Sequence, residues 1–467
     1  MKFLILFLSI SFLQFNTSAQ LSYTVSYKDS GSSVLKIAIT PSAPLTAPVS
    51  FVMPRSVPGT YGITLYDNFI MNIYAINDRG EKIAMIKNQN DAPRWLCADS
   101  GKQITRIDYE VDLNRMERKL SPADASIMRP GFVGILNYAV FGWIEGTEKQ
   151  PVQCTINTID NWPIFSTIQP TAQLPRGKFT ITTENYYVLA DGQTFIGPNF
   201  RVKEFKGITP LFIASYCQTE NEWLDDYGLQ GTMSMETLNR YFGELPFKHY
   251  SIMLIKSLPL EPGNYPALGM EHLNSSTFFG DTTGIRKSAM STTDVKRTIP
   301  TFLHHMGHAF IPLRCYGDTY LPYVLEIPPI INTIWFNEGF MWFLPYDELK
   351  FTRMKTNFEN SVYNAPPGIK ELSLQQLSQA ASTMYATDFR LGRSVFSRGA
   401  LMAIEMDTYL KTQTNGKKSM QDVLRFLYQW SKTNHRPFTI AEFPLLINKA
   451  CDIDLSAIYN KWQLPIE

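Results

Sequence analysis

Residues 302–308 read Phe-Leu-His-His-Met-Gly-His and contain three of the six histidines in this 467-residue chain. On a helix, His304 and His308 lie one turn apart on the same face. Two imidazoles in this arrangement can bind one metal ion, as they do in the zinc motif H-E-x-x-H. The glutamate of that motif, which activates water, is replaced here by His305. The segment therefore predicts a helix with a metal-binding face that lacks the usual base.

The composition indicates a globular protein with a large core. Hydrophobic residues make up 44% of the chain and charged residues 18%, and the length is enough for two or three domains. The formal net charge is only +1, so we expect no nucleic-acid partner and no attraction to anionic membranes. The five cysteines are widely spaced, and no Cys-x-x-Cys occurs, which argues against a thiolate zinc cluster.

The first nineteen residues are typical of a cleavable signal peptide. Lys2 precedes the apolar run Phe3–Leu13, and the small residues Thr17-Ser18-Ala19 form a cleavage site. A membrane anchor is the alternative, but the apolar run is too short to span a bilayer. We therefore expect an exported protein, periplasmic or secreted, without stable membrane insertion. Export permits disulfides, but the spacing does not identify pairs.

Residues 20–222 are predicted to form an antiparallel, sandwich-like β domain without intervening helices. Short segments rich in β-branched and aromatic residues alternate with turn signals, and an irregular stretch, Leu120–Gly134, interrupts them. The predicted strands are Leu21–Tyr27, Val34–Ile39, Val49–Met53, Phe69–Ile76, Lys82–Ile86, Ile104–Val111, Ile135–Trp143, Val152–Thr158, Phe179–Thr183 and Phe200–Phe205.

Residues 223–467 are predicted to form a mainly helical α+β domain. Tyr250–Ile255 is expected as a strand, Leu258–Gly263 as a loop and Ser275–Phe279 as an edge strand. Capping boxes are predicted at Ser419-x-x-Asp422 and Thr439-x-x-Glu442. The predicted helices are Ser234–Phe242, the histidine helix from about Thr298 to Pro312, Ile334–Leu344 with Thr333 as cap and Pro345 as stop, Arg393–Leu410, two helices after the capping boxes, and Leu455–Trp462.

Two acidic residues could complete a site around the histidine pair. Glu338 lies in the apolar sequence Trp-Phe-Asn-Glu-Gly-Phe, where an unpaired carboxylate would be costly to bury. A metal held by His304, His308 and Glu338 would leave one position open for water. Glu271, next to His272 on a predicted edge strand, could bind a peptide amino terminus. The alternatives are a carboxylate that caps a turn or pairs with an arginine, and a surface acid beside a solvated histidine.

The combination of these segments resembles the glycyl aminopeptidase family of zinc metallopeptidases. Gly269-Met270-Glu271-His272 is followed about thirty residues later by His-x-x-x-His and, after a similar interval, by Trp-Phe-x-Glu-Gly-Phe. Met53–Tyr61, with its Pro-Gly-Thr-Tyr end, is similar to the family's Pro-x-x-x-Pro-Gly-Ser-Tyr signature. Two C-terminal stretches also resemble the family: Ser397–Leu401 and Asn415–Val423.

The resemblance implies a gluzincin with a thermolysin-like catalytic domain behind the β domain. It assigns Zn²⁺ to His304, His308 and Glu338. It assigns recognition of peptide N-termini to the Gly269–His272 segment, with Glu271 meeting the substrate amino group beside Gly269. The activity that it implies is removal of small N-terminal residues from peptides.

The sequence departs from the family where catalytic groups are expected. His305 replaces the glutamate base, a group typically worth about 10²–10⁴-fold in rate. Val395 and Phe396 replace a tyrosine pair, one of which is expected to stabilise the oxyanion, a role worth about 10²–10³-fold. After the second histidine, only Arg314 is kept from Trp-Asn-x-Lys-Arg, and the family's C-terminal PDZ domain is expected to be absent because the chain stops at Glu467.

Two functions therefore remain open. One is a degenerate, pseudoenzyme-like member that binds zinc and peptides with hydrolysis lost or strongly reduced. The other is an active zinc aminopeptidase in which His305 or a neighbour serves as base. His305 could also become a fourth ligand and close the site, although adjacent helical positions diverge by about 100°. A structural or carbohydrate-binding protein has only the β domain in its favour. The natural substrate and the oligomeric state are not determined by the sequence.

Overall fold

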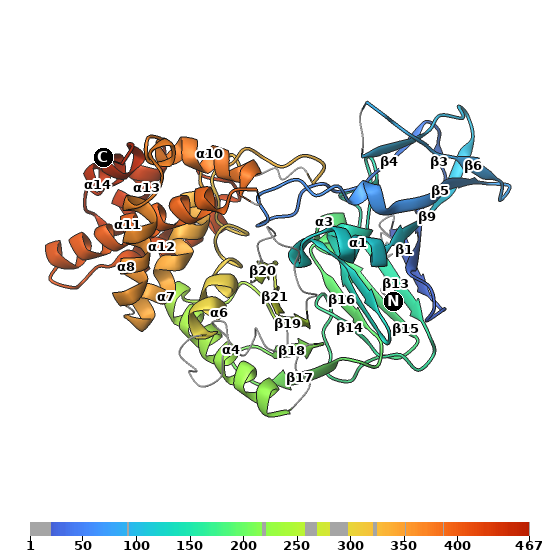
Figure 1. Ribbon diagram of the computed structural model, residues 1–467, viewed down its shortest axis with the longest axis horizontal. Coiled ribbons are helices and arrows are strands. Elements are labelled where there is room, and N and C mark those ends of the chain that lie inside the picture. The colour runs from blue at the N-terminus through green and yellow to red at the C-terminus, as the bar shows by residue number, and fades with distance from the viewer. Residues whose placement is uncertain are drawn as a thin grey trace, which may run out of the picture.

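The computed structural model describes residues 20–90, 93–216, 221–256, 269–280, 298–320, 325–350, 352–385 and 387–466. The predicted signal peptide and the predicted loop Leu258–Gly263 lie outside the described residues. Figure 1 shows β-sheets on one side of the molecule, helices on the other, and α4, α6 and a further sheet between them. The mixed α+β architecture with a β domain before a helical domain is as predicted.

The N-terminal domain contains one eight-stranded and two four-stranded sheets. Burial alternates residue by residue along β1, as the period-two pattern requires. Most pairs are antiparallel, but β1 and β13 run parallel. The strands are β1 Leu21–Tyr27, β2 Val34–Thr40, β3 Leu45–Thr46, β4 Val49–Val52, β5 Ile70–Asn77, β6 Lys82–Ala84, β7 Ile86–Lys87, β8 Arg94–Cys97, β9 Gln103–Asp112, β10 Ile127–Arg129, β11 Phe132–Leu136, β12 Trp143–Ile144, β13 Val152–Thr158, β14 Ile164–Ser166, β15 Lys178–Thr183 and β16 Gln193–Ile196.

Helices within this domain contradict the prediction of strands alone. The predicted strand Ile135–Trp143 is interrupted by helix α2, Asn137–Val140, all of whose residues are buried. A continuous apolar run does not distinguish a strand from a buried helix. Helix α1, Leu113–Lys119, begins where the Asp112 side chain accepts from the amide of Arg115. Helix α3 spans Tyr186–Ala190, and the stretch predicted as irregular, Leu120–Gly134, holds β10 and the start of β11.

A mixed sheet lies between the two domains, in the order β17-β18-β19-β21-β20. Its inner strands are buried on both faces: Leu211 and Ile252 join the helical core, whereas Phe212 and Met253 join the β core. Strand β21 is internal, so the predicted edge position of Ser275–Phe279 is wrong; β20 is the terminal strand instead. The bounds are β17 Arg201–Phe205, β18 Leu211–Ser215, β19 Tyr250–Lys256, β20 Gly269–Glu271 and β21 Ser275–Gly280.

This shared sheet spans the predicted domain boundary at residues 222 and 223. Strands β17 and β18 precede the boundary, and β19 to β21 follow it. The two cores therefore lie on opposite faces of the same strands, and the boundary itself stays a prediction.

The C-terminal half is mainly helical, with a π-helical segment, η4, before α7. Pro345 lies inside α7, so the predicted stop is wrong; the buried side chains of Met341, Phe343 and Leu344 outweigh the cost of about 3 kcal/mol for proline in a helix. The helices are α4 Asn221–Phe242, α6 Thr298–Gly307, η4 Trp335–Phe340, α7 Met341–Leu349, α8 Thr352–Tyr363, α9 Pro367–Lys370, α10 Leu374–Met384, α11 Phe389–Gln413, α12 Met420–Asn434, α13 Phe443–Cys451 and α14 Ser456–Gln463.

The sequence predicted some helices of this half but not others. Helix α4 is much longer than the predicted Ser234–Phe242, and α8, α9 and α10 were not predicted at all. The Ser419 capping box is confirmed, because Asp422 accepts from the amide of Ser419 at the start of α12. Glu442 likewise accepts from the amide of Thr439, but Glu442 and not Thr439 is the N-cap of α13. The buried Arg398 ties α11 to the end of the chain by donating to the carbonyls of Leu372, Trp462 and Leu464.

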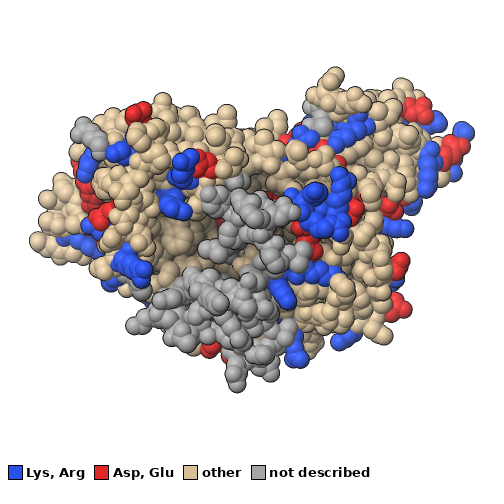
Figure 2. Space-filling view, viewed as in Figure 1, with Lys and Arg blue, Asp and Glu red and all other residues tan. Residues whose placement is uncertain are grey.

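The surface carries both signs of charge over the two domains, in keeping with the balanced composition (Figure 2). None of the helices in the described ranges is long and apolar enough to cross a membrane. The cysteines that the structure describes, Cys97, Cys154, Cys315 and Cys451, are buried free thiols.

Two glycines set the position of η4 against α11. A Cβ atom on Gly399 would lie 2.0 Å from the carbonyl oxygen of Trp335, and one on Gly339 would lie 2.6 Å from the Cα of Gly399. The two backbones therefore approach more closely than any side chain allows. This approach fixes the neighbouring residue, Glu338, relative to the helical core.

Gly399→Ala is expected to lower the free energy of unfolding by about 1–3 kcal/mol, because the added methyl group meets backbone atoms that cannot rotate away. Gly368→Ala is the matched control, since nothing lies within 4 Å of the added Cβ and the residue is in helix α9. The control is expected to be neutral or more stable by about 0.4–1 kcal/mol. Urea unfolding followed by circular dichroism measures both, and equal midpoints for the two variants would contradict the close approach.

Candidate metal centre

Three predicted ligands converge at the junction of α6 and η4. The Nε2 atoms of His304 and His308 are 3.1 Å apart, and they lie 3.3 and 3.5 Å from Oε2 of Glu338. All three residues are almost fully buried. Glu338 follows the histidine pair by 30 or more positions in the sequence, and the fold brings all three residues together.

The separations of these three atoms fit a tetrahedral zinc site. Bonds of about 2.0–2.1 Å in a tetrahedron place neighbouring ligand atoms roughly 3.3–3.4 Å apart. The three observed separations of 3.1, 3.3 and 3.5 Å lie around that value. Two imidazoles and one carboxylate are also a donor set typical of catalytic zinc, with one position left open. The residues present thus fit the metal that the spacing predicts.

The contacts around the imidazoles orient them for this role. Nδ1 of His308 lies 2.9 Å from the carbonyl oxygen of Ile311, to which it can donate, so that Nε2 presents its lone pair to the cluster. The ring of His304 stacks on Trp342, with centroids 4.0 Å apart and planes inclined by 19°. These two contacts orient the rings. The helix itself ends at Gly307, earlier than the predicted Pro312, so His308 lies in the turn that follows it.

The electrostatics of the cluster favour a bound cation. Burial lowers the pKa of His304 to about 3, and the neighbouring His308 adds to that effect. Burial would also lower the pKa of His308, but the carboxylates of Glu271 and Glu338 outweigh it and raise that pKa to about 9. Burial would raise the pKa of Glu338, yet His308 and His304 hold it far below its usual range. Two ionised carboxylates in this buried space need positive charge, which a proton or a metal ion can supply.

The β domain contributes one wall of the site. The hydroxyl group of Tyr61 donates to Oε1 of Glu338 over 2.8 Å, leaving Oε2 toward the histidines. The backbone just before it turns sharply, with positive φ at Gly59 and at Tyr61 itself. A Cβ atom on Gly59 would lie 2.3 Å from Oε1 of Glu271, so only glycine fits there. The Pro-Gly-Thr-Tyr segment was singled out in the sequence, but its part in the site was not predicted.

His305 faces Glu271 and Gly269 on strand β20. Its Nδ1 lies 3.6 Å from Oε2 of Glu271, and its Nε2 would lie 2.6 Å from a Cβ atom on Gly269. The ring also packs edge-on against Phe278, with centroids 5.3 Å apart. One ring nitrogen of His305 nevertheless lies within 4.8 Å of nitrogens of His304 and His308. The three histidines are closer together than their positions on the helix suggest.

Glu271 and His272 are both buried, so the alternative of a surface acid beside a solvated histidine is wrong. Glu271 is 5% exposed and His272 is fully buried. The ring nitrogens of His272 contact Gln193 and Asp191 of the β domain, at 2.6 and 3.2 Å. Asp191 also accepts from the amide of Leu273 at 2.7 Å. The segment is therefore an interdomain contact as well as part of the site.

A tyrosine lies beside the position where one is missing from the family pattern. Val395 is buried in the helical core, whereas Phe396 stacks on Tyr385, with centroids 5.6 Å apart and planes inclined by 25°. The Tyr385 ring also lies against Gly392, where a Cβ atom would be 2.2 Å from it. Burial and the charges of Glu338 and Glu271 raise the pKa of Tyr385, which keeps its hydroxyl protonated. No sequence signal marked Tyr385, because it precedes α11 and belongs to no motif.

Comparisons with known proteins agree with this architecture. Residues 22–198 match the family described as Peptidase M61 N-terminal domain. An aminopeptidase N family protein from Idiomarina loihiensis is 19% identical with a TM-score of 0.80, covering 96% of this chain and 76% of that one. A mutant M1 zinc metallopeptidase from Deinococcus radiodurans bound to a Tyr-Ser-Ala substrate is 15% identical with a TM-score of 0.55, covering 96% and 94%.

Yeast LTA4 hydrolase is 12% identical with a TM-score of 0.54, and the alignment covers 96% of this chain and 68% of that one. No curated protein matches the sequence. Since these identities are low, the structural likeness establishes the fold alone, and the family match covers only residues 22–198. Residues 22–198 thus match the Peptidase M61 N-terminal domain family, and the chain as a whole shares the fold of the M1 zinc metallopeptidases compared with it.

Proposed function

We propose that this protein is an exported, zinc-binding member of the metallopeptidase-like proteins in which peptide hydrolysis is lost or strongly reduced. The observation that carries the proposal is the state of His305, which stands where the family has its glutamate base and lies against Glu271. Export rests on the Lys2 and Phe3–Leu13 signal pattern of the sequence.

Zinc binding is supported by His304, His308 and Glu338. Their donor atoms are buried, mutually spaced for a tetrahedral ion and oriented by neighbouring contacts. A bound zinc ion would supply Lewis acidity, polarising the scissile carbonyl and lowering the pKa of water. Everything else in the reaction depends on protein groups that hold the substrate and move its protons.

The protein groups for proton transfer are poorly placed. A general base must reach the attacking water, whereas Nδ1 of His305 lies 3.6 Å from Oε2 of Glu271 and its Nε2 lies beside Gly269, although one of the two is also within 4.8 Å of a nitrogen of each ligand histidine. Loss of such a base typically costs about 10²–10⁴-fold in rate. The ring of Phe396 has no hydrogen-bond donor, and loss of one oxyanion donor costs about 10²–10³-fold. These two losses make a slow or inactive enzyme the expected result.

Peptide N-termini remain the ligand that the site suits best. Glu271 carries a negative charge beside the metal position, and β20 is the terminal strand of its sheet, where an extended peptide could pair. The Deinococcus enzyme with the same fold is bound to a tripeptide substrate. His305 and Gly59 both contact the Glu271 carboxylate, so a substrate amino group must compete with His305 for it.

A second candidate is an active aminopeptidase, and Tyr385 is the observation that favours it. Its hydroxyl is kept protonated beside the two carboxylates of the site, and its ring stacks on Phe396. Tyr385 could therefore supply the donor that Phe396 lacks. His305, with Glu271 as its partner, would then have to serve as the base.

Purified protein is expected to retain one zinc ion per chain after dialysis, measured by atomic emission. His304→Ala and Glu338→Gln should each lose most of the metal, because two remaining ligands do not hold the ion tightly. His435→Asn is the control, since His435 is exposed and lies outside the cluster. Zinc retained by both ligand variants would contradict the assignment.

Tyr61→Phe is expected to weaken zinc affinity by about 10–100-fold, because the hydroxyl group that holds Oε1 of Glu338 is removed while the ligand itself stays. Competition with a fluorescent chelator measures the affinity. Tyr109→Phe is the control: it also removes a buried hydroxyl group, but one that donates to the carbonyl of Val140 in the β core. If the two variants bind zinc equally well, Tyr61 does not position the ligand.

The double variant His305→Glu/Phe396→Tyr is expected to hydrolyse alanyl- and glycyl-peptides faster than the unaltered protein, by at least about 10²-fold, since both proton-transfer groups are restored. Release of the free amino acid is measured with and without a chelator. Removal of zinc should abolish the activity of the variant.

The same assay separates the two candidates. Rapid, chelator-sensitive turnover by the unaltered protein would rule out the proposal that hydrolysis is lost or strongly reduced, and it would favour the active aminopeptidase. In that case Tyr385→Phe should lower kcat by about 10²-fold or more, with zinc content unchanged.

A further inference from the structure

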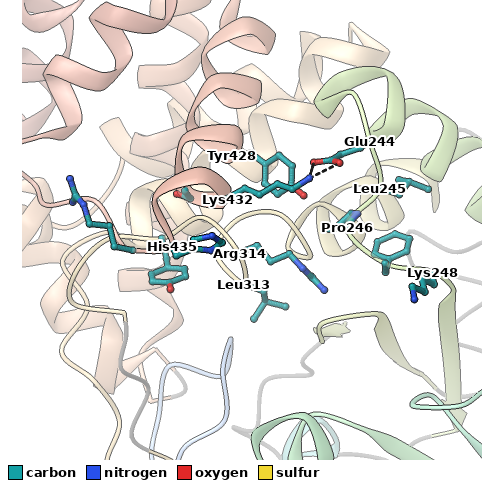
Figure 3. Close-up of a pocket in the computed structure, with 13 residues that line it drawn as sticks. Glu244, Leu245, Pro246, Lys248, Leu313, Arg314, Tyr428, Lys432 and His435 are labelled. Atoms are coloured by element: carbon teal, nitrogen blue, oxygen red, sulfur yellow. Dashed lines mark hydrogen bonds and ion pairs between the residues drawn. The ribbon is translucent and has the colours of Figure 1, made fainter. Parts of the chain in front are cut away.

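A cavity lies on the helical side of the molecule, apart from the candidate metal centre. Its volume is about 670 Å³, and none of the metal-centre residues lines it. Three segments form its walls: the loop 244–248 between α4 and β19, the segment 313–316 after α6, and the C-terminal end of α12 (Figure 3). The volume falls within the range of about 300–1,000 Å³ found for small-molecule sites.

Basic side chains outnumber acidic ones around this cavity. Lys248, Arg314, Lys432 and Arg436 line it, against one carboxylate, Glu244. Lys432 is neutralised by Glu244, with Nζ 2.6 and 2.8 Å from the two carboxylate oxygens. Arg436 pairs with Glu442 outside the cavity. Within the described ranges of the chain, neither Lys248 nor Arg314 forms a salt bridge, although Asp191 lies close enough to Arg314 to act on its charge. The residues that line the cavity therefore carry an excess of positive charge.

Arg314 is the central cation. Its Nη1 donates to the carbonyl oxygens of Leu273 and Ala309, at 3.0 and 2.7 Å. These bonds fix the side chain but leave its Nε and Nη2 without a protein acceptor among the residues that the structure describes. Figure 3 shows the guanidinium group reaching into the space between the α12 side chains and the loop that carries Lys248. Burial lowers the pKa of Arg314, and the nearby Tyr428 and Asp191 offset this only in part.

The remaining walls are apolar or aromatic. Leu245 and Phe247 come from the loop, Leu313 and Tyr316 from the segment after α6, and Tyr428 from α12. A cavity with a few convergent polar groups on an apolar wall is typical of sites for organic ligands. An inorganic ion alone would leave most of this wall in contact with water.

We propose that this cavity binds an organic anion, whose carboxylate or phosphate group pairs with Arg314 and Lys248 and whose apolar body lies against Phe247 and Leu313. A guanidinium group with two free donor atoms suits either group, because both present oxygen atoms at the spacing of its fork. The site is independent of the proposed metal function, since it shares no residue with the metal centre.

Isothermal titration with phenyl phosphate and with benzoate tests the proposal and separates the two head groups. The full chain is expected to bind at least one of them at one site, with Kd below about 1 mM and weaker binding as salt rises. Lys248→Gln and Arg314→Gln should weaken binding by about tenfold or more. Lys449→Gln, which removes an exposed lysine outside the cavity, should bind like the unaltered protein.

Lys248→Gln decides the result if Arg314→Gln does not fold, since Arg314 also holds two backbone carbonyls. Equal affinities of Lys248→Gln and Lys449→Gln would overturn the proposal. So would the absence of saturable binding of both probes to the unaltered protein.

Discussion

The ionised carboxylate of Glu338 is buried in a segment of aromatic residues. The groups that must offset its negative charge determine how the surrounding segments pack. His304 of α6 and His308, which follows the end of that helix, lie near Oε2, and the hydroxyl group of Tyr61 donates to Oε1. To bring these groups together, η4 must lie against α11 at the distance that Gly339 and Gly399 allow. The Trp-Phe-Asn-Glu-Gly-Phe motif thus combines a charge that needs partners with a glycine that lets the backbone reach them.

The two domains do not act as separate units in this arrangement. The sheet β17–β21 has the helical core on one face and the β core on the other. Tyr61 and Gly59 reach the carboxylates of the second domain, and His272 in turn contacts Asp191 and Gln193 of the first. A salt bridge from Arg94 to Glu326 adds a further link, with two bonds of 2.7 and 2.9 Å. The candidate metal centre therefore depends on residues of both domains and not of the helical half alone.

Sequence patterns predicted most strands, the Ser419 capping box and the histidine pair, because each rests on short-range spacing, whereas Glu338 came from its apolar surroundings and from the family resemblance. They failed where tertiary packing decides: at Pro345, which the core holds inside α7, and at Asn137–Val140, a buried helix in an apolar run. The internal position of β21 and the roles of Tyr61 and Tyr385 depend on contacts between distant segments, which spacing does not encode. The direction of the His305 ring likewise follows from β20, more than thirty residues earlier in the chain.

The replacement at position 305 changes the charge of the site as well as its proton transfer. With glutamate there, as in the family pattern, three carboxylates would surround a divalent ion, and the cationic amino group of a peptide would restore neutrality. With His305, the two carboxylates Glu271 and Glu338 already balance such an ion. The attraction for a charged amino terminus is therefore weaker, and Glu271 has a partner on its own protein. Under the proposed function, this one difference removes the base and part of the recognition together, so that peptide binding would depend more on backbone pairing with β20.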